Sequence, residues 1–204
     1  MEIEQTRSSN GGNLAKGALA LGGAALIAAT IPTPTGNPRR VFAQGAPFKD
    51  DLEILNFALT LEFFEAELYT TLAASGKLQG RDLQFIQMFG QHEQAHVAAV
   101  MTTIQKLGGT PVQKAAYNFP TLNTREEVLN LLVTVEQTGT SAYQGAAPFI
   151  QNKDILSAAG SILTVEARHT AMIRYLLGLA PSPDAFTAPL SKDEVLAKVA
   201  PFFK

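Results

Sequence analysis

The segment IQMFGQHEQAHVAAVMTTI, residues 86–104, has the periodicity of an amphipathic helix. Its small and apolar residues recur at alternating steps of four and three, the spacing of a helix face that packs inside a bundle. Glu93 falls in the same row, in the middle of the apolar face, and His96 follows three residues later. Because a carboxylate on an interior face needs a compensating partner, this segment predicts both a helical bundle and a polar site buried in it.

The same periodicity recurs along the chain after Lys49, with Gly and Pro collecting between the periodic segments. Thr124 and Ser191 are each followed by Glu three residues later, a pattern typical of a capping box at a helix start. We therefore predict a short C-terminal helix from Ser191 and four long helices. The long helices span about residues 50–74, 82–107, 124–147 and 152–177.

The connection between the second and third long helices decides the topology. It holds 16 residues, from Gly108 to Asn123, and reaches about 50 Å when extended, enough to cross the length of a bundle. Strand alternation is nowhere sustained. The predicted fold class is all-α, an antiparallel four-helix bundle with a long crossover between helices 2 and 3. The tail from Pro181 to Lys204 is expected to fold back on the bundle or to cap a partner.

The two halves of the chain share one spacing of Glu, Tyr and His. In each half a Glu precedes a Tyr by seven residues, and a second Glu, 30 or 31 residues after the first, precedes a His by three. The first half has Glu62, Tyr69, Glu93 and His96, and the second half has Glu136, Tyr143, Glu166 and His169. This agreement indicates a duplicated helical hairpin. Counted from the turns, the two Glu of each hairpin lie level within about 1.5 Å, so all four can meet in one slab.

Four ionised carboxylates in one slab would repel each other and would each lose hydration. No Lys or Arg lies in the apolar rows to compensate them. Two divalent cations would do so, because four carboxylates and two neutral imidazoles balance a charge of +4. A Glu and a His at i and i+3 can also reach the same ion. The remaining interpretation is a metal-free bundle whose carboxylates are protonated or hydrogen-bonded in water-filled gaps.

Four short segments resemble the ferritin-like superfamily, particularly its exported ferritin-like and desiccation-related proteins. They are Leu61 to Tyr69, the EQAH of residues 93–96, Glu136 to Tyr143 and the VEARH of residues 165–169. The resemblance covers residues 49–204 and implies a ferritin-like bundle with two Fe or Mn ions. It implies six metal ligands, Glu62, Glu93, His96, Glu136, Glu166 and His169.

Related di-metal proteins oxidise ferrous iron, reduce or dismutate peroxide, or activate oxygen, and the resemblance implies redox chemistry of that kind in stress protection. The alternative is a metal-binding stress protein without turnover. Glu65 departs from the pattern, because Gly139 stands at its position in the second half. It could be a seventh ligand, a proton carrier or a solvated residue at the rim.

The sequence HEQAH at residues 92–96 also fits a zinc protease, in which both His bind zinc and Glu93 acts as the base. That reading leaves the second Glu/His pair unexplained, so we expect His92 to pack near the site and not to bind metal. Tyr69 and Tyr143 lie two turns beyond a Glu on the same face. They either pack in the core or act in catalysis, by bonding a ligand carboxylate or donating an electron.

Residues 1–43 differ from the domain predicted for residues 44–204. Gly17 to Ile31 form a weakly apolar run after Lys16, shorter than the roughly 20 residues of a membrane span but typical of an export signal. Val41 and Ala43 suit cleavage before Gln44. We expect export to the periplasm or the exterior and no stable membrane span. A disordered cytoplasmic leader and an uncleaved anchor are the alternatives.

The composition of the chain limits the kinds of partner and chemistry that we expect. The net charge of −2, with no basic cluster beyond Arg39 and Arg40, argues against nucleic acid. The chain has no Cys, which excludes disulfides, thiolate catalysis and metal sites built from Cys thiolates, such as zinc ribbons and rubredoxin-type iron. The expected partners are metal ions and small oxidants. The chain could also form a homo-oligomer.

Overall fold

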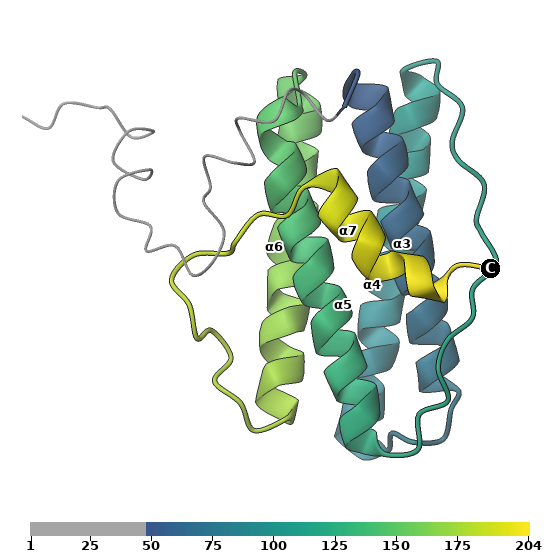
Figure 1. Cartoon of the computed structure of the whole chain (residues 1–204), viewed down its shortest axis with the longest axis vertical. Helices are drawn as coiled ribbons and strands as arrows, with labels where there is room; N and C mark the ends of the chain where they lie inside the picture. The colour runs from purple at the N-terminus through teal and green to yellow at the C-terminus, as the bar shows by residue number, and fades with distance from the viewer. Residues whose placement is uncertain (1–47) are drawn as a thin grey trace, which may run out of the picture. The chain divides into compact units, whose positions relative to one another are not determined.

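The structure is a computed structural model that describes residues 48–204, and the predictions made for the leader lie outside this range. Four long helices form an antiparallel bundle, and a short helix crosses one of its faces (Figure 1). The helices are α3 (Asp51–Ala73), α4 (Gly80–Lys106), α5 (Arg125–Ala146), α6 (Lys153–Leu176) and α7 (Lys192–Val199), with 3₁₀ turns η1 (Ala147–Phe149) and η2 (Ala200–Phe202). The predicted bundle, crossover and terminal helix are confirmed.

Local sequence accounts for where these helices begin. Both predicted capping boxes are present, at Thr124 before α5 and at Ser191 before α7. In each, the cap hydroxyl accepts from a backbone N–H and the Glu three residues on accepts from the cap. The α4 helix starts two residues earlier than predicted, at Gly80, and its cap residue Gln79 makes no side-chain hydrogen bond.

Glycines lie just after the ends of two helices, and a proline lies just after the end of a third. Gly76 and Gly108 have φ of 72° and 76°, a left-handed conformation that favours glycine, and they lie just after α3 and α4. Pro148 follows α5, which gives way there to the turn η1. These breaks set the lengths of the two hairpins, and the hairpin lengths bring their central Glu residues to one height.

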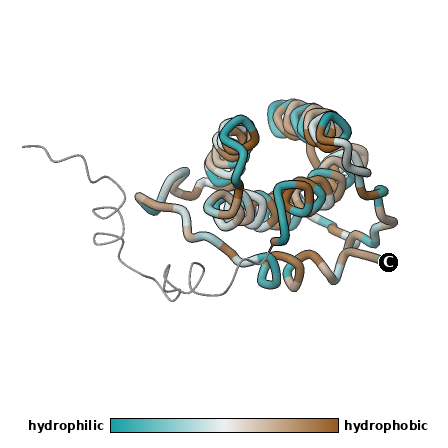
Figure 2. The backbone as a smooth tube through the Cα atoms, turned by 90° about the horizontal axis from the view of Figure 1, so that it is seen from above, coloured by the Kyte–Doolittle hydropathy of each residue, from teal (hydrophilic) through white to brown (hydrophobic). Residues whose placement is uncertain are grey.

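The apolar rows of the four long helices meet in the bundle interior, and Figure 2 shows the helices from above around this common interior. Leu59, Ile104, Leu132 and Ile173 are fully buried, one from each long helix. Leu107 fits the spacing of its apolar row, three residues after Ile104, but it is 43 % exposed. The reason is that α4 ends at Lys106, so Leu107 no longer follows the helical period.

The C-terminal segment folds back on the bundle, which was one of the two arrangements expected for it. Phe202 and Phe203 pack on Phe64 of α3 at ring-centroid distances of 5.3 and 6.1 Å. The same segment holds the crossover, because Asn118 N–H donates to the Phe202 carbonyl at 2.7 Å and Lys204 N–H to that of Ala116 at 3.0 Å. The tail therefore ties the crossover to the bundle.

Within residues 48–204, none of the helices combines the length and the apolar character that crossing a membrane requires.

Candidate metal centre

Seven ionisable side chains lie together at mid-height in the bundle, and none is more than 9 % exposed. We call them the carboxylate cluster. They come from all four long helices: Glu62 and Glu65 from α3, Glu93 and His96 from α4, Glu136 from α5, and Glu166 and His169 from α6. The six predicted ligands are thus brought to one place, together with Glu65.

The two imidazoles point their Nδ1 atoms at carboxylates. His96 Nδ1 lies 3.0 Å from Glu93 Oε2 and 3.3 Å from both Glu62 Oε2 and Glu166 Oε1. His169 Nδ1 lies 3.0 Å from Glu93 Oε1. It also lies 3.3 Å from Glu136 Oε1. Glu62 and Glu93 therefore lie at the same height in the bundle, as predicted, because His96 Nδ1 contacts the carboxylates of both.

These contacts divide the cluster into two groups of potential metal ligands. One comprises Glu62, Glu93, His96 and Glu166, and the other comprises Glu93, Glu136, Glu166 and His169. Within each group the ligand atoms lie within 4.8 Å of one another. Glu93 and Glu166 belong to both groups, so these two carboxylates are placed to be shared between two ions.

The two tyrosines connect the hairpins at the level of the cluster. Tyr69 of α3 donates a hydrogen bond to Glu136 of α5, and Tyr143 of α5 donates one to Glu62 of α3. Each phenol therefore bonds the carboxylate of the opposite hairpin and holds one of its two oxygens. Periodicity placed both tyrosines on the inner face, but only the packing of the hairpins shows which carboxylate each one meets.

Glu65 fills the space left by a glycine. An ideal Cβ added at Gly139 would stand 2.8 Å from Glu65 Oε1 and 3.1 Å from Glu166 Oε2. Glu65 is 2 % exposed, so the expectation of a solvated rim residue is wrong. It belongs to neither group of potential ligands. The missing side chain at Gly139 therefore makes room for a fifth carboxylate and breaks the symmetry of the two halves.

His92 supports one of the two imidazoles. Its Nδ1 lies 2.9 Å from His169 Nε2, and the two rings are nearly parallel, with an interplanar angle of 10°. Burial and the neighbouring His169 lower the pKa of His92, which favours its neutral form. A neutral His92 can accept a hydrogen from His169 Nε2. That hydrogen bond leaves the lone pair of His169 Nδ1 facing the carboxylates, the tautomer that metal binding requires.

Replacing His92 by Ala should weaken the ion held with His169 by about 10- to 100-fold, the usual effect of removing a partner behind a metal-binding imidazole. The ion held with His96 should keep its affinity, since His92 makes no hydrogen bond to that ring. Metal titration that resolves the two affinities would measure this. His92→Asn, whose side-chain oxygen can accept the same hydrogen, is the control. Equal weakening of both ions would contradict the assignment.

When no metal cation is bound, protons neutralise the negative charge of the carboxylates. Burial is the main cause that raises the pKa of Glu65, Glu136 and Glu166 well above the usual range, and the charges of neighbouring carboxylates add to it. Burial likewise raises the pKa of Glu62 to about 7. Burial therefore favours the protonated form of these carboxyls in metal-free protein, and metal binding must release the protons that they carry.

Glu93 and His96 form the ionised pair of the cluster. Burial opposes the charge on each of them, but the facing imidazoles of His169 and His96 lower the pKa of Glu93 to about 2. The neighbours Glu166, Glu62 and Glu93 raise the pKa of His96 to about 12 despite its burial. A cation would replace the charge that the protonated imidazole supplies here.

Metal-free protein should lose thermal stability as the pH rises from 5 to 7. A carboxyl whose pKa is raised on folding stabilises the protein below its unfolded pKa, and this contribution is lost as the pH rises through the folded pKa. For Glu62 that range runs from 4.5 to about 7. Melting temperatures at several pH values would measure the loss. Glu65→Gln should give a shallower fall, because it removes another carboxyl with a raised pKa.

Saturating divalent metal should reverse this trend, since ions bind the deprotonated cluster and their affinity rises with pH. A melting temperature of metal-free protein that increases from pH 5 to 7 would contradict the assignment of protons to the cluster.

The residues present fit a pair of cations. Several buried side-chain oxygen and nitrogen atoms of the cluster have no hydrogen-bond partner within the described residues. They are Glu62 Oε2, Glu93 Oε1, Glu136 Oε2, both carboxylate oxygens of Glu166 and His169 Nδ1. Buried polar atoms without partners are rare and costly in folded proteins. These atoms are the oxygen and nitrogen donors that first-row divalent metals bind.

The protease reading of HEQAH gains no support from this geometry. That reading needs His92 and His96 on one ion with Glu93 free to act as a base. Instead, His92 contacts the ring of His169, and Glu93 lies between both imidazoles as a member of both ligand groups.

Fold and site together define a class, the four-helix bundles that carry a duplicated Glu/His metal-binding cluster in their interior. The comparisons with known proteins agree. The family profile for the ferritin-like domain matches residues 50–179, more than half of the chain. The chain therefore belongs to the ferritin-like family. Among curated proteins, none matches this sequence.

Two solved structures share the fold. A conserved hypothetical protein from Mycobacterium tuberculosis is 21 % identical, and the match covers 65 % of this chain and 94 % of that one, with a TM-score of 0.56. A dodecameric thioferritin, the bacterioferritin-related protein from Bacteroides fragilis, is 24 % identical over 69 % of this chain and 91 % of its own, with a TM-score of 0.55. At these identities the likeness concerns the fold alone.

Proposed function

We propose that this protein binds two divalent metal ions, Fe or Mn, and uses them in redox chemistry on oxygen, peroxide or ferrous iron. The observation that supports it most is the pair of overlapping ligand groups with Glu93 and Glu166 in common. A single structural ion would need only one such group. The ions, when bound, would supply redox equivalents and a Lewis acid at a buried site.

The protein's own residues have separate roles in this proposal. Glu62 with His96 would hold one ion and Glu136 with His169 would hold the other, while Glu93 and Glu166 would contribute to both. Tyr143 and Tyr69 orient Glu62 and Glu136 by donating to one oxygen of each. The apolar helices around the cluster keep bulk water out and so strengthen the electrostatic contacts within it.

Glu65 is suited to carrying a proton. Its carboxyl is buried beside the cluster, with a pKa raised by burial and by the charge of Glu166, and it belongs to neither ligand group. It can therefore hold a proton next to Glu166 while the six ligands bind the ions. Tyr69 and Tyr143 remain candidates for electron donation, although their hydrogen bonds already account for their positions.

Metal content and oxidant consumption test this function together. The protein would be loaded anaerobically with ferrous or manganous ions, analysed for metal per chain, and then exposed to oxygen or hydrogen peroxide. Two ions per chain with consumption of either oxidant is the expected result. Two ions without consumption would favour the second candidate, a metal-binding stress protein that sequesters Fe or Mn. One zinc per chain with peptide cleavage would instead favour a protease.

The place and assembly of the protein are further proposals. Export rests on the apolar run of Gly17 to Ile31 and the small residues before Gln44. A role in desiccation or other stress rests on the resemblance to exported ferritin-like proteins. Assembly into a homo-oligomer is suggested by the dodecameric Bacteroides fragilis protein of the same fold. Size-exclusion chromatography and N-terminal sequencing of protein from its native compartment would test these points.

A further inference from the structure

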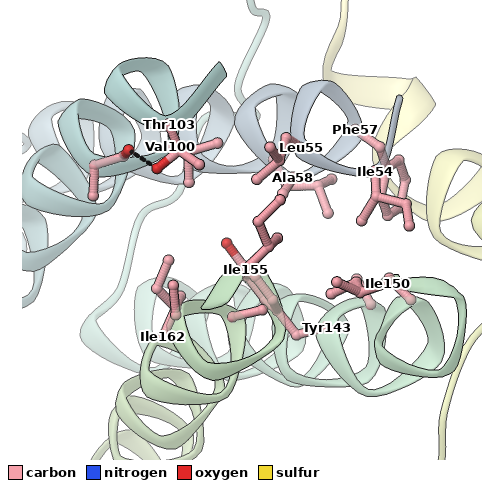
Figure 3. A pocket seen from close by; sticks show the side chains of 16 residues that line it. Ile54, Leu55, Phe57, Ala58, Val100, Thr103, Tyr143, Ile150, Ile155 and Ile162 are labelled. Atoms are coloured by element: carbon pink, nitrogen blue, oxygen red, sulfur yellow. Dashed lines mark hydrogen bonds between the residues drawn. The ribbon is translucent and has the colours of Figure 1, made fainter. Parts of the chain in front are cut away.

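A small cavity lies between the two hairpins, beside the carboxylate cluster. It has a volume of about 60 Å³. Figure 3 shows Leu55, Ala58 and Val100 on one side of it, from α3 and α4, and Ile155 and Ile162 of α6 on the other. We call it the apolar pocket. Exposed Ala99 of α4 and Ala158 of α6 also line it, so the pocket can be reached from the surface between these two helices.

The lining offers no free side-chain donor to a guest. Among the described residues that line the pocket, the only side-chain hydroxyls belong to Thr103 and Tyr143, and both protons are already used. Thr103 donates to the Ala99 carbonyl of its own helix at 2.8 Å, and Tyr143 donates to Glu62. Water in a small cavity needs two or more polar partners, whereas apolar cavities of this kind bind xenon or small hydrocarbons. The pocket therefore favours an uncharged, non-polar molecule of a few atoms.

Tyr143 forms the boundary between the apolar pocket and the cluster. Its ring lines the pocket, while its hydroxyl bonds the Glu62 carboxylate inside the cluster. Ala58, on the opposite side, stands four residues before Glu62 on the same helix. A molecule in the pocket would thus be separated from the ligand carboxylates by the side chain of Tyr143.

A different groove, also between α4 and α6, approaches the cluster from nearer the start of α4 and the end of α6. It has a volume of about 430 Å³ and is lined by His92, His96, Arg168 and His169 together with apolar residues of α4 and α6. Its ring nitrogens and its exposed guanidinium suit ions and polar molecules. The two routes to the cluster therefore differ in chemistry, and a polar guest would favour the His92 side.

We propose that the apolar pocket is a binding site for one small non-polar molecule of the size of a diatomic gas, admitted between Ala99 and Ala158. If the proposed redox function holds, on which this second step rests, the molecule is dioxygen. Hydrogen peroxide carries two hydroxyls that would lose most of their hydrogen bonds in such a lining, so this route favours dioxygen over peroxide. The pocket then determines which oxidant reaches the cluster from its apolar side.

Xenon tests the binding site without any metal. Crystals of metal-free protein under xenon pressure should show one xenon atom in the apolar pocket. Ala99→Phe places a large side chain at the entrance on an exposed position and should abolish that xenon. Ala98→Phe is the matched control, because Ala98 is an exposed neighbour on α4 that does not line the pocket, and xenon should remain. An empty or water-filled pocket in the parent protein would overturn the proposal.

Rapid mixing tests the oxidant. In protein loaded with ferrous ions, Ala99→Phe should slow oxidation by dioxygen by about tenfold and leave oxidation by hydrogen peroxide unchanged. Ala98→Phe should change neither rate. Equal slowing of both oxidants, or of neither, would overturn the assignment of dioxygen to the pocket. If xenon binds but the loaded protein consumes neither oxidant, the proposed redox function fails while the binding site stands.

Discussion

Glu166→Gln should remove both metal ions from the protein, whereas Glu62→Gln should remove only one. Glu166 belongs to both groups of potential ligands, and Glu62 belongs to the group of His96 alone. The amide keeps the size of the carboxyl but lacks the charge that compensates a divalent cation. Elemental analysis after loading and desalting would give the metal content per chain.

The same substitutions should not unfold the metal-free protein. Burial raises the pKa of Glu166 well above its usual range and that of Glu62 to about 7, which favours the neutral form of both carboxyls at pH 6. A neutral amide then replaces a neutral acid. Circular dichroism of metal-free variants would confirm that the helices are retained. If Glu166→Gln keeps one ion, as Glu62→Gln does, the carboxylate of Glu166 is not shared and the two ligand groups are wrong.

Gly145→Ala should cause a large loss of stability, because the added methyl group meets backbone. An ideal Cβ at Gly145 would stand 1.9 Å from the Leu190 carbonyl oxygen and 2.9 Å from its carbon. Leu190 is held there because its N–H donates to the Ser141 carbonyl at 3.1 Å. Since the clash is with backbone, no side-chain rotation relieves it, and the segment before α7 must move off α5.

We expect this variant to lose about 3 kcal/mol of unfolding free energy, the upper end for overpacking, and to melt about 6–12 °C lower. Limited proteolysis should also cleave the segment between α6 and α7 faster. Gly160→Ala is the matched control, because a Cβ at Gly160 of α6 meets nothing within 4 Å. It should gain about 0.5–1 kcal/mol, as Ala favours the helix. Similar melting temperatures for the two variants would contradict the tight contact at Leu190.

Much of the bundle could be predicted because its determinants are local. Thr124 and Ser191 mark helix starts through bonds made within four residues, and Gly76 and Gly108 mark ends through a backbone conformation of their own. Leu107 shows the limit of this reasoning. Its apolar side chain fits the period, but the helix ends one residue earlier, and the residue becomes exposed.

The ligand residues could also be predicted, for a related reason. Glu93 and Glu166 each stand in an apolar row, and a row becomes an interior face in whatever bundle the helices form. His96 and His169 follow at a step of three, which places each on the same face as its Glu. None of these inferences requires knowledge of how the second hairpin lies on the first.

Sequence by itself determined which helices residues 48–204 form and the row in which each ligand stands, because these depend on neighbours within a few residues along the chain. Only the tertiary structure decided that Tyr69 and Tyr143 bond the carboxylates of the opposite hairpin, that Glu65 occupies the space beside Gly139, and that His92 supports His169. These contacts join residues that are about 70 or more positions apart along the chain, and their distances depend on how closely the two hairpins pack. Periodicity places a side chain on a face, whereas its partner across the interior is chosen by packing.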